Sequence, residues 1–378
     1  MTALKYPIVK PFLPPLNNYT AHIASVFERN WLTNNGPCLQ KLEQQLAGYF
    51  NVEHLLLVAN GTLALQVAFA ALNIDTNESG CVLTTPFSFA ATASSLCFAN
   101  LTPEFIDIDP ETYNIDIAKA SEAQLNKATA ILGVHVFGNP CDVAGIERAA
   151  KQHNLKVIYD AAHAFASDIK NTDNDMTITS VLHKGDVATL SLHATKLFHS
   201  VEGGAIVFKH KADYLKAKQL INFGFDAQQY PEFVGINAKM SEVHAAMGLS
   251  VFEHLDHITS WRQQLSKRYT ERLKAINTVQ LQVWHCDGNN NGAYMPVVFE
   301  SQTLLLKVQA ALTEVGVQTR RYFFPSLSQV PAYGMRGDTP LANSLSERIL
   351  CLPMFTDLTL DGVDEICDHL MTVLKANT

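Results

Sequence analysis

Long apolar runs, paired cysteines and basic clusters are all missing from this sequence of 378 residues. No stretch approaches the roughly 20 uncharged apolar residues of a membrane-spanning helix, so we expect no association with a membrane. The seven cysteines are odd in number, widely spaced and without a CxxC pair, which argues against a disulfide framework and a structural zinc site. The 28 lysines and arginines form no run and the formal net charge is −8, so we expect no nucleic-acid partner.

The first residues, Met1 to Leu13, alternate lysine, proline and apolar side chains and lack the apolar core of a signal peptide. We therefore expect a cytoplasmic protein with free thiols and without a metal. What the composition does provide is 47% hydrophobic residues, which suffice for a globular core. Because a chain of this length exceeds what one compact core usually holds, the sequence predicts one large and one smaller domain.

From about residue 50 to residue 210, short apolar runs alternate with helical patterns. Strands are predicted from seven apolar runs, at residues 54–58, 81–84, 104–108, 130–134, 156–159, 187–192 and 204–208. Helices are predicted between some of these runs, at residues 63–72, 90–99 and 142–153. This alternation predicts a mostly parallel sheet with helices on both faces. Open α/β sheets bind ligands at the carboxyl ends of their strands, so polar residues just past these ends are candidates for chemistry.

The pattern changes after about residue 245. A long amphipathic helix is predicted from Glu242 to about Arg272, because apolar residues recur at helical spacing without a turn signal. It leads into a smaller α+β region that contains a turn at residues 289–292, Asn-Asn-Asn-Gly. The predicted division is a large domain over residues 1–250, including an N-terminal arm, and a small C-terminal domain over residues 251–378.

The first candidate segment is Asn60-Gly61-Thr62, between a predicted strand and a predicted helix. Glycine lets the backbone approach a ligand closely, while amides at the helix start and the Thr62 hydroxyl can bind a phosphate. The alternative is an ordinary N-cap, since threonine often caps helices.

The second candidate pair, Asp160 and His163, follows another predicted strand. A carboxylate at a buried strand end needs a cationic partner or several hydrogen-bond donors, and a protonated ring nitrogen is such a partner. The alternatives are a helix cap for Asp160 and a core histidine for His163.

The third candidate is Lys196, which lies between two apolar runs, close after Ser191 and shortly before Gly203-Gly204. Most lysines are solvated surface charges. A lysine partly withdrawn from water, however, has a lowered pKa and becomes a nucleophilic amine that can form a Schiff base. A fourth segment, residues 235–242, runs into the long helix and could equally be a simple helix start capped by Ser241.

The order of these features points to one cofactor. A phosphate-type turn is followed by the aromatic pair Phe87 and Phe89, then by the acid Asp160 and finally by Lys196. Pyridoxal 5′-phosphate (PLP) needs a phosphate cradle, a stacking ring, an anion for its pyridine nitrogen and a lysine that forms an imine. The set is therefore more specific than any of its members.

Five runs carry a resemblance to a known family: residues 60–62 (Asn-Gly-Thr), 160–163 (Asp-Ala-Ala-His), 191–196 (Ser-Leu-His-Ala-Thr-Lys), 202–205 (Glu-Gly-Gly-Ala) and 235–240 (Gly-Ile-Asn-Ala-Lys-Met). With them the chain resembles the DegT/DnrJ/EryC1/StrS sugar aminotransferases over nearly its whole length. The resemblance implies an α/β fold-type-I PLP-dependent transferase. Its large domain would hold a mostly parallel sheet of the seven-stranded type, and a smaller α+β domain would follow.

The resemblance also implies a role for each matching residue. Lys196 would bind the cofactor covalently and then move a proton between the amino-acid carbon and the cofactor carbon. Asp160 would pair with the pyridinium nitrogen, His163 would approach the ring hydroxyl, and Phe89 would stack on the ring.

The cofactor phosphate has its own implied set. Within the chain the resemblance assigns this contact to Gly61, Thr62 and Ser191. Asn237 would instead reach the phosphate of a partner subunit, which implies a homodimer with shared active sites.

Some positions depart from the common pattern of the family. Asn60 stands where serine is usual and His163 where glutamine is frequent, and both changes keep a hydrogen-bonding side chain. Residues 321–325 (Arg-Tyr-Phe-Phe-Pro) replace a commoner substrate loop that contains His-Tyr. Together with residues 31–37 (Trp-Leu-Thr-Asn-Asn-Gly-Pro), this loop looks closest to family members that aminate C4 of a dTDP-linked sugar.

The expected reaction is transfer of the amino group of L-glutamate to dTDP-4-dehydro-6-deoxy-D-glucose, a step that serves O-antigen or antibiotic-sugar synthesis. Arg320 and Arg321 are candidates for the nucleotide pyrophosphate or the glutamate carboxylate, since a guanidinium suits either oxyanion; solvated surface arginines are the alternative. Tyr322 could hydrogen-bond the sugar or act as an aromatic lid.

Other functions within the same fold remain open. The amine could go to C3 of the sugar, or the nucleotide could be GDP or UDP. A sugar dehydratase of the family would carry histidine at the position of Lys196, which argues against that reaction. A regulatory protein on a degenerate scaffold should lack one of the cofactor residues, and none is missing.

Overall fold

The central sheet of the computed structural model, which describes residues 4–74, 80–170 and 177–376, has seven strands in the order β1-β9-β8-β5-β4-β2-β3. Six strands run parallel, and β9 is antiparallel to both of its neighbours. The strands span β1 Leu55–Val58, β2 Cys81–Thr84, β3 Thr102–Phe105, β4 Ala128–Val134, β5 Lys156–Asp160, β8 Val187–Ser191 and β9 Gly204–Phe208. The prediction of an α/β fold with a mostly parallel sheet is confirmed.

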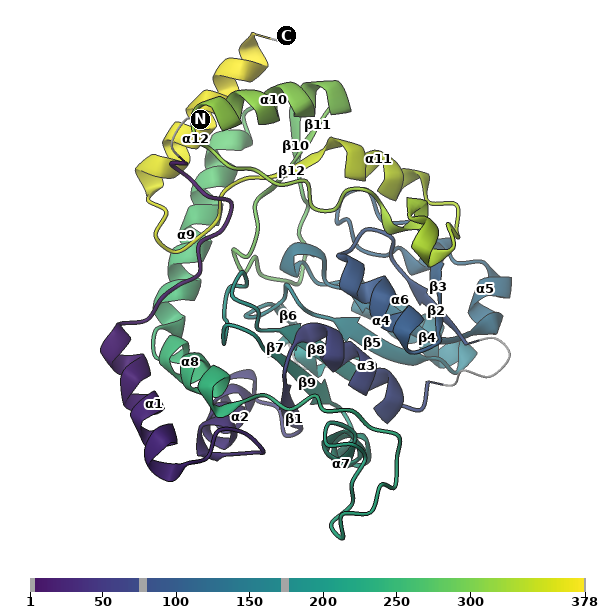
Figure 1. Cartoon of the computed structure of the whole chain (residues 1–378). Helices are drawn as coiled ribbons and strands as arrows, with labels where there is room; N and C mark the ends of the chain where they lie inside the picture. The colour runs from purple at the N-terminus through teal and green to yellow at the C-terminus, as the bar shows by residue number, and fades with distance from the viewer. Residues whose placement is uncertain (1–3, 75–79, 171–176, 377–378) are drawn as a thin grey trace.

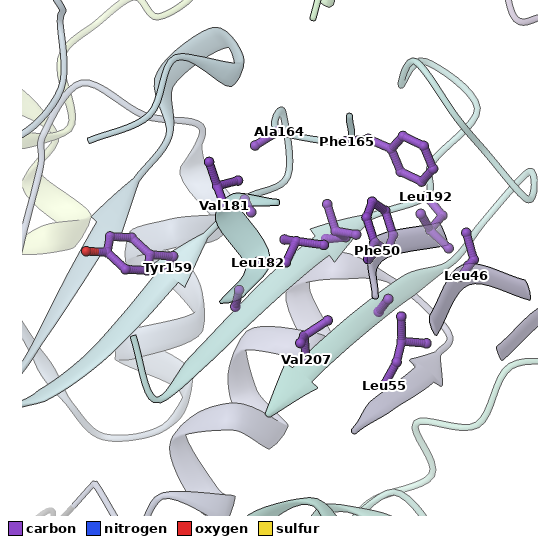
Figure 2. Packing of buried hydrophobic residues seen from close by; sticks show 14 of the residues in the cluster. Leu46, Phe50, Leu55, Tyr159, Ala164, Phe165, Val181, Leu182, Leu192 and Val207 are labelled. Carbon is purple, nitrogen blue, oxygen red and sulfur yellow. The ribbon is translucent and has the colours of Figure 1, made fainter. Parts of the chain in front are cut away.

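Helices cover both faces of this sheet, because its strands are apolar on both sides. Along β1, Leu55 and Leu57 join one core cluster, whereas Leu56 and Val58 join another, as the alternation of side chains along a strand requires. Figure 2 shows part of the first cluster, which includes Phe50, Leu55 and Leu182. The helices of this part of the chain are α1 Leu16–Arg29, α2 Pro37–Phe50, α3 Gly61–Ala71, α4 Ala90–Phe98, α5 Glu122–Lys127, α6 Val143–His153, α7 Lys211–Leu220 and α8 Glu242–Phe252, and α8 packs against α1 and α2.

A second, smaller sheet follows in the chain. It is antiparallel, in the order β10-β11-β12, and a short hairpin β6-β7 lies apart from it. These elements and the helices of the C-terminal part span β6 Asp168–Lys170, β7 Ile178–Ser180, β10 Val279–Leu281, β11 Pro296–Phe299, β12 Ile349–Cys351, α9 Leu255–Leu273, α10 Gln302–Glu314, α11 Pro340–Arg348 and α12 Leu360–Lys375. Figure 1 shows α9 leading from α8 toward α10 and α12, with which it shares a core. The division predicted at residue 250 stays a prediction.

The long helix expected from Glu242 to about Arg272 is two helices. Helix α8 ends at Phe252 and α9 begins at Leu255, because His254 has backbone angles outside the helical range. Helix α8 packs against α1 and α2 and joins the core cluster of the large sheet, whereas the later part of α9 packs into the C-terminal core. The chain therefore turns where it passes from one core to the other, and sequence periodicity alone did not reveal that break.

The predicted strand at 104–108 also shifted. It begins at Thr102 and ends at Phe105, where its neighbour β2 ends opposite, at Thr84.

All seven cysteines are free thiols. Within the part of the chain that is described, no helix has both the length and the apolar character needed to cross a membrane.

Candidate active site

A cavity of about 350 Å³ opens at the carboxyl ends of β1, β5 and β8. Its walls come from both parts of the chain. The ends of the three strands and the residues just after them contribute Gly61, Thr62, Asp160, His163, Ser191 and Lys196, and Phe89 closes one side. The C-terminal part contributes Tyr294, Arg320, Tyr322 and Phe323. Most of the residues predicted to be functional are therefore brought together in one place.

The start of α3 forms a site suited to an anion. The Asn60 side chain accepts a hydrogen bond from the Leu63 amide at 2.9 Å, so Asn60, and not Thr62, is the N-cap. The amides of Gly61 and Thr62 and the Thr62 hydroxyl have no acceptor among the described residues, and they lie at the positive end of the α3 dipole. A Cβ at Gly61 would lie 3.0 Å from the Ser191 Cβ, so glycine lets β8 end close to this turn.

Asp160 is a buried carboxylate at the end of β5, with 5% of its surface exposed. Its oxygens accept hydrogen bonds from the Thr92 hydroxyl at 2.8 Å and from the Ala162 amide at 3.1 Å. Burial raises its pKa, against the opposing effects of these two donors and of Lys196. No cationic side chain in the described ranges lies within 4.0 Å of it. The carboxylate thus lacks the cationic partner that a protonated pyridine nitrogen would supply.

His163 is a neutral histidine whose tautomer is set by the backbone. Burial lowers its pKa well below the ordinary value. The Phe137 amide donates to its Nδ1 at 3.3 Å, so the ring proton is on Nε2. The ring packs against Tyr294 and Phe323, at centroid distances of 4.7 and 5.8 Å. The Nε2–H is therefore a fixed hydrogen-bond donor in a cavity wall.

Lys196 is half-buried on a turn that its own amide closes by donating to the His193 carbonyl at 2.9 Å. Its Nζ donates a hydrogen bond to the Tyr294 hydroxyl at 3.2 Å. Burial lowers the pKa of the amine to about 8, although Asp160 acts in the opposite direction. About a tenth of the amine is therefore neutral at pH 7, and that form is the nucleophile.

The aromatic pair divides between core and cavity. Phe87 is fully buried, whereas Phe89 is 53% exposed and lines the cavity at the start of α4. Only Phe89 can therefore lie over a ring bound there.

The two neighbouring arginines diverge in the same way. Arg320 lines the cavity and its guanidinium lies 4.7 Å from the centre of the Tyr322 ring, with no carboxylate within 4.0 Å among the residues the structure describes. Arg321 points elsewhere: it donates to the carbonyls of Ser346 and Glu347 and lies over the Phe324 ring. Consecutive side chains of an extended chain face opposite ways. Of the two candidate arginines only Arg320 lines the cavity, and its contact with substrate stays a prediction.

Asn237 does not line this cavity. It is exposed on the segment that bridges back to Asn222, and the neighbouring Ala238 carbonyl accepts from the Ala59 amide. Its predicted contact with a partner subunit stays a prediction.

Sequence reasoning missed several residues of the cavity and its supports. Thr92 bonds Asp160 and Tyr294 bonds Lys196, while Phe323 packs on His163. Thr92 lies in an alanine-rich helical stretch and Tyr294 just after a turn, so neither position carries a local signal. One group of side chains able to ligate a metal, His285, Cys286 and Asp287, occurs in the described ranges, and none of the three lines the cavity.

The donor set matches what PLP requires. One cavity holds a helix start with free amides and hydroxyls, a buried carboxylate without a cation, an exposed aromatic ring and an amine of lowered pKa. The cradle is also narrow, because a side chain at Gly61 would crowd Ser191.

Known proteins share both the sequence and the fold. The DegT/DnrJ/EryC1/StrS aminotransferase family matches residues 17–371. A dTDP-4-amino-4,6-dideoxy-D-glucose transaminase of Shigella dysenteriae is 40% identical over 371 residues, covering 97% of this chain and 98% of that protein. A GDP-perosamine synthase of Escherichia coli O157:H7 is 27% identical over 371 residues, covering 97% of this chain and 98% of that protein. The crystal structure of DesI in the presence of its TDP-sugar product has a TM-score of 0.89 at 29% identity and covers 100% of this chain and 95% of that chain. The chain therefore belongs to the DegT/DnrJ/EryC1/StrS aminotransferase family and is a PLP-dependent sugar aminotransferase.

Proposed function

We propose that the chain transfers the amino group of L-glutamate to C4 of dTDP-4-dehydro-6-deoxy-D-glucose, with dTDP-4-amino-4,6-dideoxy-D-glucose and 2-oxoglutarate as products. The single observation that carries the transamination is that one cavity holds both Lys196, an amine with a pKa of about 8, and Asp160, a buried carboxylate with no cationic side chain within 4.0 Å among the described residues. The choice of sugar is supported by the Shigella dysenteriae transaminase, which is 40% identical.

Each group of the cofactor has a counterpart in the cavity. The amides of Gly61 and Thr62 and the hydroxyls of Thr62 and Ser191 would bind the phosphate, and Phe89 would cover one face of the ring. When bound, PLP supplies an electron sink that stabilises negative charge on the carbon next to the transferred nitrogen.

Asp160 would keep that electron sink effective. An ionised carboxylate against the ring nitrogen favours the protonated, electron-withdrawing ring, and the Thr92 hydroxyl and the Ala162 amide hold its oxygens in place. His163 would donate its Nε2–H to the ring oxygen, because its Nδ1 is already occupied by the Phe137 amide. Both residues orient the ring and neither changes its own covalent structure.

Lys196 is the residue that moves the proton. With a pKa of about 8 its amine can accept a proton from the substrate carbon and return it to the cofactor carbon on the other side of the transferred nitrogen. Lys196 is also the side chain that would hold the cofactor between turnovers.

Arg320 would bind the anionic part of either substrate. Its guanidinium is unpaired within the described part of the chain and suits both a carboxylate and a pyrophosphate. Because both substrates would then compete for one cavity, the first product must leave before the second substrate binds. The expected kinetics are ping-pong, with Tyr322 beside Arg320 as a hydrogen-bonding group for the sugar.

A homodimer is part of this proposal. Asn237 lies on a segment whose apolar side chains are unusually open to solvent, namely Phe223, Tyr230, Val234 and Ile236, with exposures of 48, 69, 99 and 39%. A second copy covering this face would remove those side chains from water and bring Asn237 toward the phosphate of its partner's cofactor. We place this dimer in the cytoplasm.

The proposal is tested with purified protein, L-glutamate and a panel of keto-sugar nucleotides. The protein with PLP should absorb in the visible, lose that absorption on addition of L-glutamate and regain it with dTDP-4-dehydro-6-deoxy-D-glucose. Lys196→Ala should abolish turnover and leave the cofactor only non-covalently held. Recovery of the absorption only with a 3-keto sugar, or only with a GDP- or UDP-linked sugar, would redirect the assignment of substrate; the GDP-perosamine synthase relative makes the GDP-sugar the second candidate.

A further inference from the structure

Tyr294 makes the only hydrogen bond to the Lys196 amine that the described residues provide. The Nζ of Lys196 lies 3.2 Å from the Tyr294 hydroxyl, and both side chains line the cavity. Burial raises the pKa of the phenol, so Tyr294 stays protonated throughout the working pH range. A protonated phenol can accept a hydrogen bond from an ammonium and can donate one to a neutral amine. It therefore has a partner role in both states of Lys196.

The position of Tyr294 is fixed from two sides. Asn291 is fully buried, and its amide group donates to the carbonyls of His163 and Phe165 while its oxygen accepts from the Ala293 amide. These bonds tie the segment before Tyr294 to the turn that carries His163. The hydroxyl is thus placed relative to the same turn that orients the cofactor ring.

Arg262 holds the other side. Its guanidinium is 4% exposed and donates to the carbonyls of Gly292 at 2.9 Å, Ala293 at 2.7 Å and Met354 at 2.7 Å, with no carboxylate in reach among the described residues. Burying a charge without a counter-ion costs free energy, and these hydrogen bonds offset part of that cost. They also fix the backbone just before Tyr294. The ring of Tyr294 is further confined by Phe137 and His163, with centroids at 5.3 and 4.7 Å.

We propose that Tyr294 is a positioning residue for Lys196, whose hydroxyl holds the amine at one place in the cavity whenever that amine is not bonded to the cofactor. The proposal rests on the role of Lys196 given above. A flexible lysine stem has many rotamers, and a proton carrier that serves the two carbons on either side of the transferred nitrogen must return to one position between transfers. The hydrogen bond restricts the amine to that position and stabilises its protonated form.

The test is Tyr294→Phe, which keeps the ring and removes the hydroxyl. In the cofactor-free protein the pKa of Lys196 should fall by about one unit, because the ammonium loses its acceptor. This pKa is read by competitive acetylation of lysines across pH, followed by peptide mass spectrometry, with the surface lysines as internal references. In the loaded enzyme kcat should fall about 10- to 100-fold with KM within about twofold, and the acid limb of the kcat profile should move to lower pH.

Two further variants keep the test decisive. Tyr269→Phe removes a buried tyrosine hydroxyl that donates to the Pro353 carbonyl in the C-terminal core. It should destabilise the protein about as much as Tyr294→Phe does, but it should leave the pKa of Lys196 unchanged. Should Tyr294→Phe fail to fold, 3-fluorotyrosine at position 294 keeps the shape, weakens the oxygen as an acceptor and should lower the pKa of Lys196 by less. An unchanged pKa of Lys196 in the position 294 variants, or an equal shift in Tyr269→Phe, overturns the proposal. Because acetylation needs neither cofactor nor sugar, this outcome is separate from any failure of the proposed reaction.

Discussion

Replacing Thr92 by valine would test whether Asp160 is held as an anion. Thr92 is fully buried, and its hydroxyl donates to a carboxylate oxygen of Asp160 at 2.8 Å. Its oxygen also lies 2.7 Å from the Ser88 hydroxyl. Because the single Thr92 proton goes to Asp160, Ser88 must be the donor in that second bond. Valine keeps the shape of the side chain and removes both hydrogen bonds.

The size of the effect follows from these two bonds. A hydrogen bond to an ionised group contributes about 1.5–3 kcal/mol and a neutral one about 1 kcal/mol, so Thr92→Val should cost roughly 2–4 kcal/mol of folding free energy near neutral pH. Thr84→Val is the matched control, since the Thr84 hydroxyl is equally buried and donates only to the Leu132 carbonyl. It should cost about 0.5–1.5 kcal/mol at every pH.

The destabilisation caused by Thr92→Val should depend on pH, because it involves the ionised form of Asp160. The pKa of Asp160 is raised in the folded protein above its ordinary value of 3.8, mainly by burial. Its ionised form therefore lowers stability at neutral pH, and that penalty disappears as the pH falls through the folded pKa. Removing the Thr92 donor raises this pKa further and enlarges the penalty. The cost of Thr92→Val should thus shrink by about 1 kcal/mol or more between about pH 7 and about pH 4.

The assay is equilibrium urea unfolding of the cofactor-free protein, followed by circular dichroism across that pH range for the wild type and both variants. Subtracting the control removes the contribution of all other carboxylates. If the cost of Thr92→Val were independent of pH, or equal to that of Thr84→Val, Asp160 would not be an anion in the empty cavity. The carboxylate would then not be the ionised partner that a cationic ring nitrogen requires.

Two further predictions follow from the same geometry. Arg320→Ala should raise KM for L-glutamate about 10- to 100-fold in steady-state assays. Arg321→Ala should change this KM less than about twofold, because Arg321 faces away from the cavity. Equal changes in KM would contradict the assignment of substrate binding to Arg320 alone. Glu242→Gln should destabilise the fold by about 2–4 kcal/mol in urea unfolding, since this carboxylate is 0% exposed and accepts from the Cys38 and Leu39 amides at the start of α2. The surface control Glu365→Gln should cost less than about 1 kcal/mol.

The positions of the strands could be predicted because the sequence signals that mark a strand are local. Each strand of the large sheet is a short apolar run ended by a turn residue, and six of the seven predicted runs overlap their strands with shifts of two residues or fewer at either end. The seventh, β3, ends early because its length is limited by its neighbour β2. The break between α8 and α9 was missed, since both helices have apolar residues at helical spacing and only their different packing partners separate them.

Gly61, Asp160 and Lys196 were identified as functional candidates from the sequence by itself, because a turn glycine, a strand-end acid and a lysine between apolar strands occur together in the order that PLP requires. Only the tertiary structure decided what surrounds them. Thr92 and Tyr294 reach Asp160 and Lys196 from segments distant in the chain and without any pattern of their own.

The same limit applies to the choice between Arg320 and Arg321. The sequence placed both beside Tyr322, but the direction of each side chain depends on which neighbouring segment the extended backbone pairs with. Arg320 pairs with Cys351 of β12, and this register turns its side chain toward the cavity and that of Arg321 away from it. Residue type and spacing are properties of the chain, whereas the partners of a side chain are created when distant segments pack together.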